Sequence, residues 1–117
     1  MIEVSCDGSL GMESQQIKDY QITASSSFNN DFVTYGPQRA RLNLAPGYRA
    51  NPAKLNSSWI KVNLETDKVI TGLATQGYGD LAVREWVTSY SVMYRSKSRD
   101  FLQIKTLQGA SKVGYTK

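Results

Sequence analysis

An all-β domain, built as a sandwich or barrel of short strands, is the fold class that the sequence predicts. Three observations lead to it. Apolar and polar residues alternate with the strand period of two in several short runs. The connections between these runs are rich in Gly, Asn and Asp, and no segment keeps a helical period for three turns. With 117 residues, the chain has the length of one domain.

The runs expected to form strands are residues 21–27, 59–64, 69–75, 86–94 and 101–107. The second run shows the pattern most clearly, because Ile60, Val62 and Leu64 alternate with polar neighbours and would share one half-buried face. The other runs combine β-branched or aromatic residues with polar segments at their ends. We expect the two tryptophans, Trp59 and Trp86, to fill the core or to cap its end.

The region between residues 28 and 58 is long and irregular, and Pro37, Pro46 and Pro52 interrupt it. Irregular segments of this length in a compact domain are usually functional or disordered. Within it, Arg41 of the motif ARLN is expected to make a buried or half-buried hydrogen-bonded pair rather than a ligand contact.

The sequence offers little for catalysis. It has no histidine, which excludes Ser-His-Asp and Cys-His nucleophile systems and histidine-based metal sites. Cys6 is the single cysteine, and a structural thiol or half of a disulfide is the simplest interpretation of it. Asp80 with Glu85, or Asp31 with Asp80, are the carboxylate pairs to consider for glycoside hydrolysis, and their spacing alone does not support it. The glycines of GYGD do not precede a helix and do not form a phosphate-binding loop. We therefore expect a protein that is no enzyme and needs no metal or cofactor.

The charge of the chain narrows the possible partners. The formal net charge is +4 and the isoelectric point is about 9.3, but the basic residues are scattered. No dense run of Lys and Arg marks a nucleic-acid partner, so none is expected. Mild basicity suits anionic membranes or acidic glycans, and it is equally typical of an ordinary solvated surface. No stretch approaches the roughly 18 apolar residues of a membrane-spanning helix.

Several motifs resemble the discoidin domain family, the C-type module of coagulation factors five and eight. The segment CDGSLGMESQQIKDYQITASSSF resembles the opening of these domains, and ARLN, SWIKVNL, VITGLATQG and WVTSYSVMY follow in the family's order. The resemblance covers Cys6 to about Tyr94. It implies a discoidin-type jelly-roll β-sandwich, related to galactose-binding folds, that is extracellular, non-enzymatic and binds ligands through loops at one end.

The resemblance also carries an expectation about the C-terminal end of the chain. The sequence stops at SKVGYTK, whereas modules of the family are longer and end in further strands. Residues 1–117 are therefore expected to form a single discoidin-like domain that lacks its last strands. The cysteine that pairs with Cys6 in the family would then be absent from this chain. An open sheet edge would favour self-association.

In lipid-binding members of the family, loops at one end of the sandwich carry exposed apolar residues that enter the bilayer. FNNDFVTY resembles the first such loop, with Phe32 near its tip, and YGDLA resembles the second, with Leu81 at its tip. A shallower third loop falls around residues 52–55, the segment PAKL. An alternative is that Phe32 and Leu81 fold back onto the sandwich. The residues expected to bind ligand are Asn30, Asp31, Phe32, Tyr35, Tyr48, Arg49, Lys54, Leu55, Tyr78, Asp80, Leu81, Ala82 and Arg84, with Arg39 nearby.

The expected function is therefore extracellular binding or adhesion, in a secreted protein or an ectodomain. An anionic phospholipid surface, phosphatidylserine especially, is the leading ligand. A lectin-like or protein-binding module is the alternative, in which Tyr35, Tyr48 and Tyr78 would contact sugars or a peptide. A glycan-targeting module attached to a hydrolase is a further alternative. Asn56-Ser57-Ser58 is a glycosylation sequon, and a glycan there would crowd the third loop.

Overall fold

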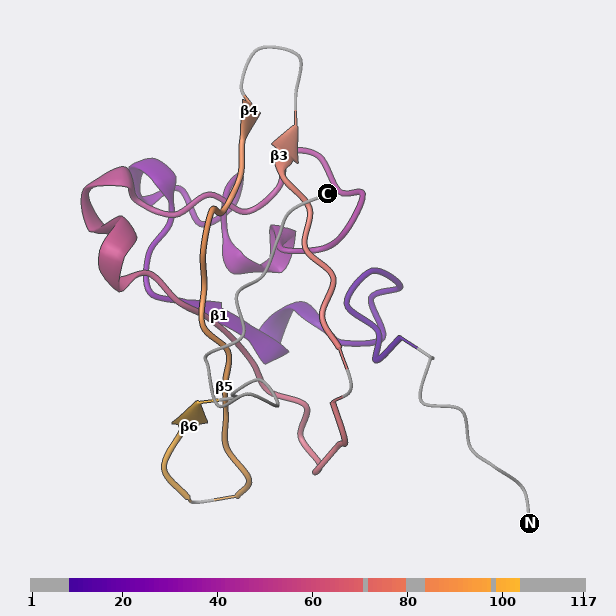
Figure 1. Ribbon diagram of the computed structural model, residues 1–117. Coiled ribbons are helices and arrows are strands. Elements are labelled where there is room, and N and C mark those ends of the chain that lie inside the picture. Colours follow the sequence, from indigo (N-terminus) through magenta and orange to yellow (C-terminus); the bar gives the residue numbers. More distant parts are fainter. Residues whose placement is uncertain (1–8, 71, 80–83, 98, 104–117) are drawn as a thin grey trace.

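The computed structural model describes residues 9–70, 72–79, 84–97 and 99–103, and within them the chain forms short antiparallel strand pairs joined by long irregular segments (Figure 1). The strands are β1 (Ile22–Ala24), β2 (Ile60–Val62), β3 (Tyr78–Gly79), β4 (Arg84–Glu85), β5 (Met93–Tyr94) and β6 (Leu102–Gln103). They pair as β1–β2, β3–β4 and β5–β6. The helical residues of the described ranges lie in single 3-10 turns, η1 (Asp19–Gln21), η2 (Phe28–Asn30), η3 (Pro37–Arg39) and η4 (Pro52–Ser57). The expected all-β class is confirmed.

The β1–β2 pair joins the first two predicted strands. Ile22 lies opposite Val62, and Ala24 lies opposite Ile60. Backbone hydrogen bonds extend this pairing at both ends, from the Asn63 N–H to the Gln21 carbonyl and from the Ser25 N–H to the Trp59 carbonyl. The predicted strands 21–27 and 59–64 therefore form, although the regular part of each is three residues long.

The best-buried part of the described chain lies beside this pair. Ile17 and Ile22 are its buried apolar residues, and polar residues are buried with them. Gln21 donates from Nε2 to the Asn63 carbonyl at 2.8 Å, while its Oε1 accepts from the Lys18 N–H. Because buried polar groups are costly unless they are hydrogen-bonded, these bonds determine how the segment before β1 packs on β2.

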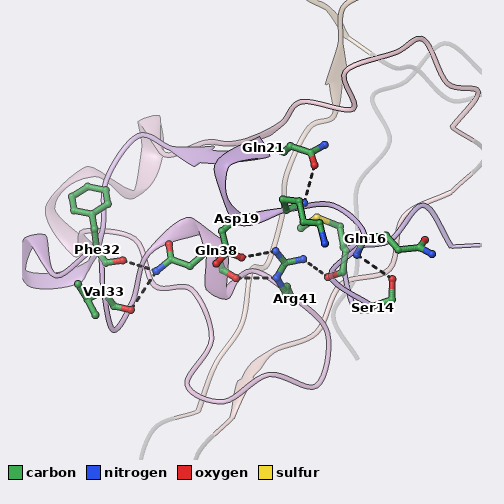
Figure 2. A network of polar contacts seen from close by, with 10 residues as sticks. Ser14, Gln16, Asp19, Gln21, Phe32, Val33, Gln38 and Arg41 are labelled. Carbon is green, nitrogen blue, oxygen red and sulfur yellow. Dashed lines mark hydrogen bonds and ion pairs between the residues drawn. The ribbon is translucent and has the colours of Figure 1, made fainter.

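Arg41 lies at the centre of a polar network next to this core, as Figure 2 shows. Its guanidinium donates from Nη1 to the Met12 carbonyl at 2.6 Å and from Nε to the Gln38 carbonyl at 3.1 Å. Nη2 forms an ion pair with Asp19 Oδ1 at 2.7 Å. The residue is 7% exposed. The expectation of a buried, hydrogen-bonded Arg41 is confirmed.

Two of the predicted strands are wrong over most of their length. The described residues of 69–75 form no strand, and of residues 86–94 only Met93 and Tyr94 pair, with β6. The alternation in these segments is typical of strands, but a strand also needs a neighbour to which its backbone can hydrogen-bond. Of the predicted strand 101–107, residues 102 and 103 form β6, and residues 104–107 lie outside the described ranges.

Of the two places expected for the tryptophans, the filled core is wrong, and an exposed position at its end stays a prediction. Trp59 is 50% exposed and Trp86 is 62% exposed. Side chains two apart in an extended segment point to the same face, so Trp59 shares the outer face with exposed Lys61, whose ammonium lies 5.7 Å from the indole ring. Trp86 directly follows the short strand β4, and the segment that it begins, residues 86–92, forms no strand.

Candidate ligand-binding loops around Arg49

The first loop, residues 28–35, is shaped by its own short polar side chains. Asn29 and Asn30 of η2 have φ angles of 55° and 58°, a left-handed conformation that asparagine tolerates better than most residues. The Asp31 carboxylate then accepts hydrogen bonds from the backbone N–H groups of Val33 at 3.1 Å and Thr34 at 2.9 Å. These bonds, the one from Thr34 foremost, lower the pKa of Asp31. Asp31 therefore acts as the turn residue of the loop.

This turn exposes two apolar side chains. Phe32 is 48% exposed and Val33 is 85% exposed. Their backbone carbonyl groups are hydrogen-bonded within the protein. Gln38 Nε2 donates to the Phe32 carbonyl at 2.7 Å and to the Val33 carbonyl at 3.3 Å (Figure 2). A Cβ at Gly36 would collide with the Phe32 carbonyl oxygen, so this position requires glycine. The loop thus bonds its polar backbone internally and presents its apolar side chains outward.

The third loop forms the 3-10 turn η4. The Asn51 side chain accepts from the Ala53 N–H at 3.0 Å and caps the turn, and Pro52 occupies its first position. The hydroxyl of Ser58 donates to the Lys54 carbonyl at 2.8 Å and closes the far end. Leu55 is 64% exposed and follows the exposed Lys54 directly. An apolar tip and a basic residue are therefore adjacent.

The first and third loops meet at the backbone of Arg49. Its carbonyl accepts from the Phe28 N–H at 2.9 Å, and its N–H donates to the Tyr35 carbonyl at 3.3 Å. Two residues further, the Asn51 N–H donates to Ser26 Oγ at 3.0 Å. Both ends of the first loop and the start of the third are therefore joined in one hydrogen-bonded base.

The Arg49 side chain connects this base to the β3–β4 pair. Its guanidinium carbon lies 3.9 Å from the centre of the Phe28 ring and 5.3 Å from that of Tyr78. Nε and Nη2 donate to the two carboxylate oxygens of Glu85 at 2.9 and 2.8 Å, a bidentate pair. The hydrogen bond to Glu85 is the main cause of a raised Arg49 pKa. One side chain thus contacts segments that are far apart in the sequence.

The three tyrosines expected at the ligand are all engaged in this arrangement. The Tyr48 hydroxyl donates to the Ser26 carbonyl at 2.9 Å. Burial raises the pKa of Tyr48, and this hydrogen bond offsets part of the increase. The Tyr35 ring packs edge-on against Phe28, with ring centres 5.3 Å apart. The Tyr78 ring faces Arg49. Their aromatic surface stabilises the loop base.

The structure brings together most of the predicted ligand-binding residues that it describes, namely Asn30, Asp31, Phe32, Tyr35, Tyr48, Arg49, Lys54, Leu55 and Tyr78. Arg39, at the end of η3, donates from Nε to the Pro46 carbonyl at 2.8 Å. Asn56 lies exposed in η4. For Arg84 the structure describes the backbone alone, which lies in β4. Asp80, Leu81, Ala82 and Cys6 lie outside the described residues.

Sequence reasoning missed two residues of this arrangement. Val33 is more exposed than Phe32, and its position directly after Phe32 could have indicated it. The sequence suggests Glu85 only as one half of a carboxylate pair, whereas in the structure it forms an ion pair with Arg49. Nothing local in the sequence relates positions 49 and 85, because the contact between them depends on how the chain folds back.

Two features are absent from the part of the chain that the structure describes. No group of three or more Cys, Asp or Glu side chains lies close enough together there to hold a metal ion. In the same ranges, no helix is both long and apolar enough to cross a membrane.

Comparison with known proteins places the chain in a family. The F5/8 type C domain matches residues 12–117. Human coagulation factor VIII is 39% identical over 98 residues, which cover 82% of this chain and 4% of that protein. Human EGF-like repeat and discoidin I-like domain-containing protein 3 is 40% identical over 94 residues, 76% of this chain and 20% of that protein. Discoidin domain-containing receptor tyrosine kinase B of Caenorhabditis elegans is 37% identical over 95 residues, 76% of this chain and 12% of that protein.

The chain therefore spans a fifth or less of the length of these relatives. The match covers nearly all of the chain and includes the segments that carry both loops and Arg49. The chain belongs to the F5/8 type C, or discoidin, domain family, whose members are β-sandwich modules for binding and adhesion and are not themselves enzymes.

Proposed function

We propose that this domain is an extracellular module that binds anionic phospholipid membranes, phosphatidylserine especially. The observation that supports the proposal is the exposure of Phe32, Val33 and Leu55 on two loops that share one hydrogen-bonded base. A side chain of this size gains about 1.5–3 kcal/mol when it is fully buried in an apolar phase. These three side chains together are enough for weak, reversible membrane attachment.

The direction of the loops supports the same conclusion. In Figure 1, η2 and η4 lie on the same side of the molecule, away from the indigo N-terminal segment. The hydrogen bonds at the loop base keep them together. A membrane accepts several separate apolar tips at once and needs no preformed cavity for them.

Charge adds to the attraction. Lys54 stands beside Leu55, and a basic residue at an anionic membrane surface contributes about 1 kcal/mol. The net charge of +4 acts in the same direction at longer range. The negative charge of Asp31 opposes it, but the carboxylate is hydrogen-bonded to two backbone N–H groups of its own turn.

A glycan or peptide ligand has less support from the described residues. Such a ligand would need open aromatic faces or a hollow near the loops, and the tyrosines of this region are engaged in the loop base. Two hollows of about 390 and 440 Å³ are present elsewhere. Their linings include Asp19 and Arg41 in one and Gln21 and Glu65 in the other, and no residue of the two loops.

Vesicle co-sedimentation tests the proposal. The purified domain should sediment with phosphatidylcholine vesicles that contain phosphatidylserine and stay in solution with pure phosphatidylcholine. The double variant Phe32→Ala, Leu55→Ala should bind at least tenfold more weakly, because the side chains are 48% and 64% exposed and their burial in lipid is worth about 1.5 kcal/mol or more together. Its melting temperature should hardly change, since both side chains are exposed. Equal sedimentation with both vesicle types, or strong signals on a glycan array with none on vesicles, would contradict the proposal.

A further inference from the structure

We propose that Arg49 is a positioning residue, whose ion pair with Glu85 holds the first and third loops in their docking arrangement, and that it is no direct ligand of the headgroup. This inference rests on the proposed membrane function. By sequence alone, Arg49 is one of several basic residues available to an anionic surface. The contacts around its side chain indicate a different role.

One hydrogen-bonding edge of the guanidinium, formed by Nε and Nη2, is already occupied. Nε and Nη2 donate to the two oxygens of Glu85, and the guanidinium carbon lies over the Phe28 ring, 3.9 Å from its centre. A phosphate or carboxylate that approached this edge would compete with Glu85 for the same pair of donors. The Arg49 side chain is 16% exposed, compared with 50% for Glu85. An incoming anion would therefore have to displace Glu85 from this edge, or bind at the remaining N–H donors beside the exposed Glu85 carboxylate, which would repel it.

The backbone of Arg49 is also the place where the two loops join. It bonds both Phe28 and Tyr35, the residues at the two ends of the first loop. Asn51, which caps the third loop, is two residues further along. Movement of Arg49 therefore changes the position of Phe32 relative to Leu55.

Preorganisation of the two loops explains why the position of Arg49 should affect membrane binding. Loops that are held in place before they reach the membrane do not lose further conformational freedom when they dock. If the Arg49 side chain is released, the two apolar tips must be ordered at the membrane surface, and affinity falls. The ion pair thus contributes to binding although neither partner contacts lipid.

The two possible roles of Arg49 predict opposite effects of one substitution. Glu85→Gln removes a negative charge and frees the guanidinium. If Arg49 binds headgroups directly, this variant should bind anionic vesicles more tightly than wild type. If Arg49 positions the loops, the same variant should bind more weakly, despite its more favourable net charge.

The experiment compares wild type, Glu85→Gln and Glu13→Gln by co-sedimentation with phosphatidylcholine vesicles that contain phosphatidylserine. Glu13→Gln is the matched control, because it makes the same charge change in the N-terminal segment, where the new amide oxygen can still accept from Asn43. We expect Glu85→Gln to bind about threefold to tenfold more weakly than the control, the range for loss of a partly exposed charge pair. Arg49→Lys should also bind more weakly than wild type, because an ammonium keeps the charge but loses the bidentate fork.

Amide hydrogen exchange without lipid supplies a second readout. Exchange at the Phe28 and Arg49 amides, which close the loop base, should be faster in Glu85→Gln and unchanged in Glu13→Gln. Tighter or unchanged vesicle binding by Glu85→Gln, or exchange equal to wild type, overturns the positioning role. If wild type binds no vesicles, the proposed membrane function fails, and the exchange rates still decide whether the pair holds the loops.

Discussion

Replacing Arg41 should destabilise the domain far more than removing its charged partner. Arg41 is 3% exposed in its side chain, while Asp19 is 69% exposed, so water already screens the carboxylate. The other bonds of the guanidinium go to the carbonyl groups of Met12 and Gln38. Arg41 therefore acts mainly by satisfying backbone acceptors that belong to separate segments.

The magnitude follows from these contacts. In Arg41→Ala, two carbonyl groups lose a charged donor, at about 1.5–3 kcal/mol for each such bond. Relaxation and entry of water reduce the total, and we expect a loss of about 3 kcal/mol in the free energy of unfolding. Asp19→Asn removes one charge but leaves both carbonyl bonds, so it should cost under about 1 kcal/mol.

Urea unfolding of the three proteins, followed by tryptophan fluorescence, measures these differences. The midpoint of Arg41→Ala should fall clearly below that of wild type, and that of Asp19→Asn should lie close to wild type. Equal losses in both variants would mean that the ion pair carries the interaction. A loss below about 0.5 kcal/mol in Arg41→Ala would refute the role given to its carbonyl bonds.

Three further outcomes are expected. Gly36→Ala should lower the free energy of unfolding by more than about 1 kcal/mol in urea melts, because its Cβ would meet the Phe32 carbonyl; a neutral effect would contradict this geometry. The pKa of Asp31 lies below its ordinary value of 3.8, so its turn contributes stability that is complete above that pH and is lost as the pH falls through the lowered pKa. Titration of the capped amides by NMR should show this, and Asp31→Asn should abolish it. A glycan on Asn56, next to the exposed Leu55, should weaken vesicle binding in protein from a glycosylating host, and Asn56→Gln should restore it; equal binding by both forms would contradict this.

The family was predictable from the order of motifs along the chain, and the fold class from the alternation of apolar and polar residues. The buried, hydrogen-bonded state of Arg41 was predictable as well. These features are local or compositional. The lack of histidine, the alternation around Ile60 and the turn-forming residues near Asp31 each act over a few positions. The first loop and its Phe32 tip followed from the resemblance to the family, and the structure decided between the two alternatives by leaving Phe32 48% exposed.

The arrangement of the loops was decided by tertiary structure. Arg49 meets Glu85 across 36 positions of sequence, and it meets Phe28 and Tyr35 through backbone bonds that no local pattern encodes. The same limit explains the wrong predictions for Trp59 and Trp86. A period of two indicates which side chains share a face of a strand, but whether that face is covered depends on which distant segment packs against it.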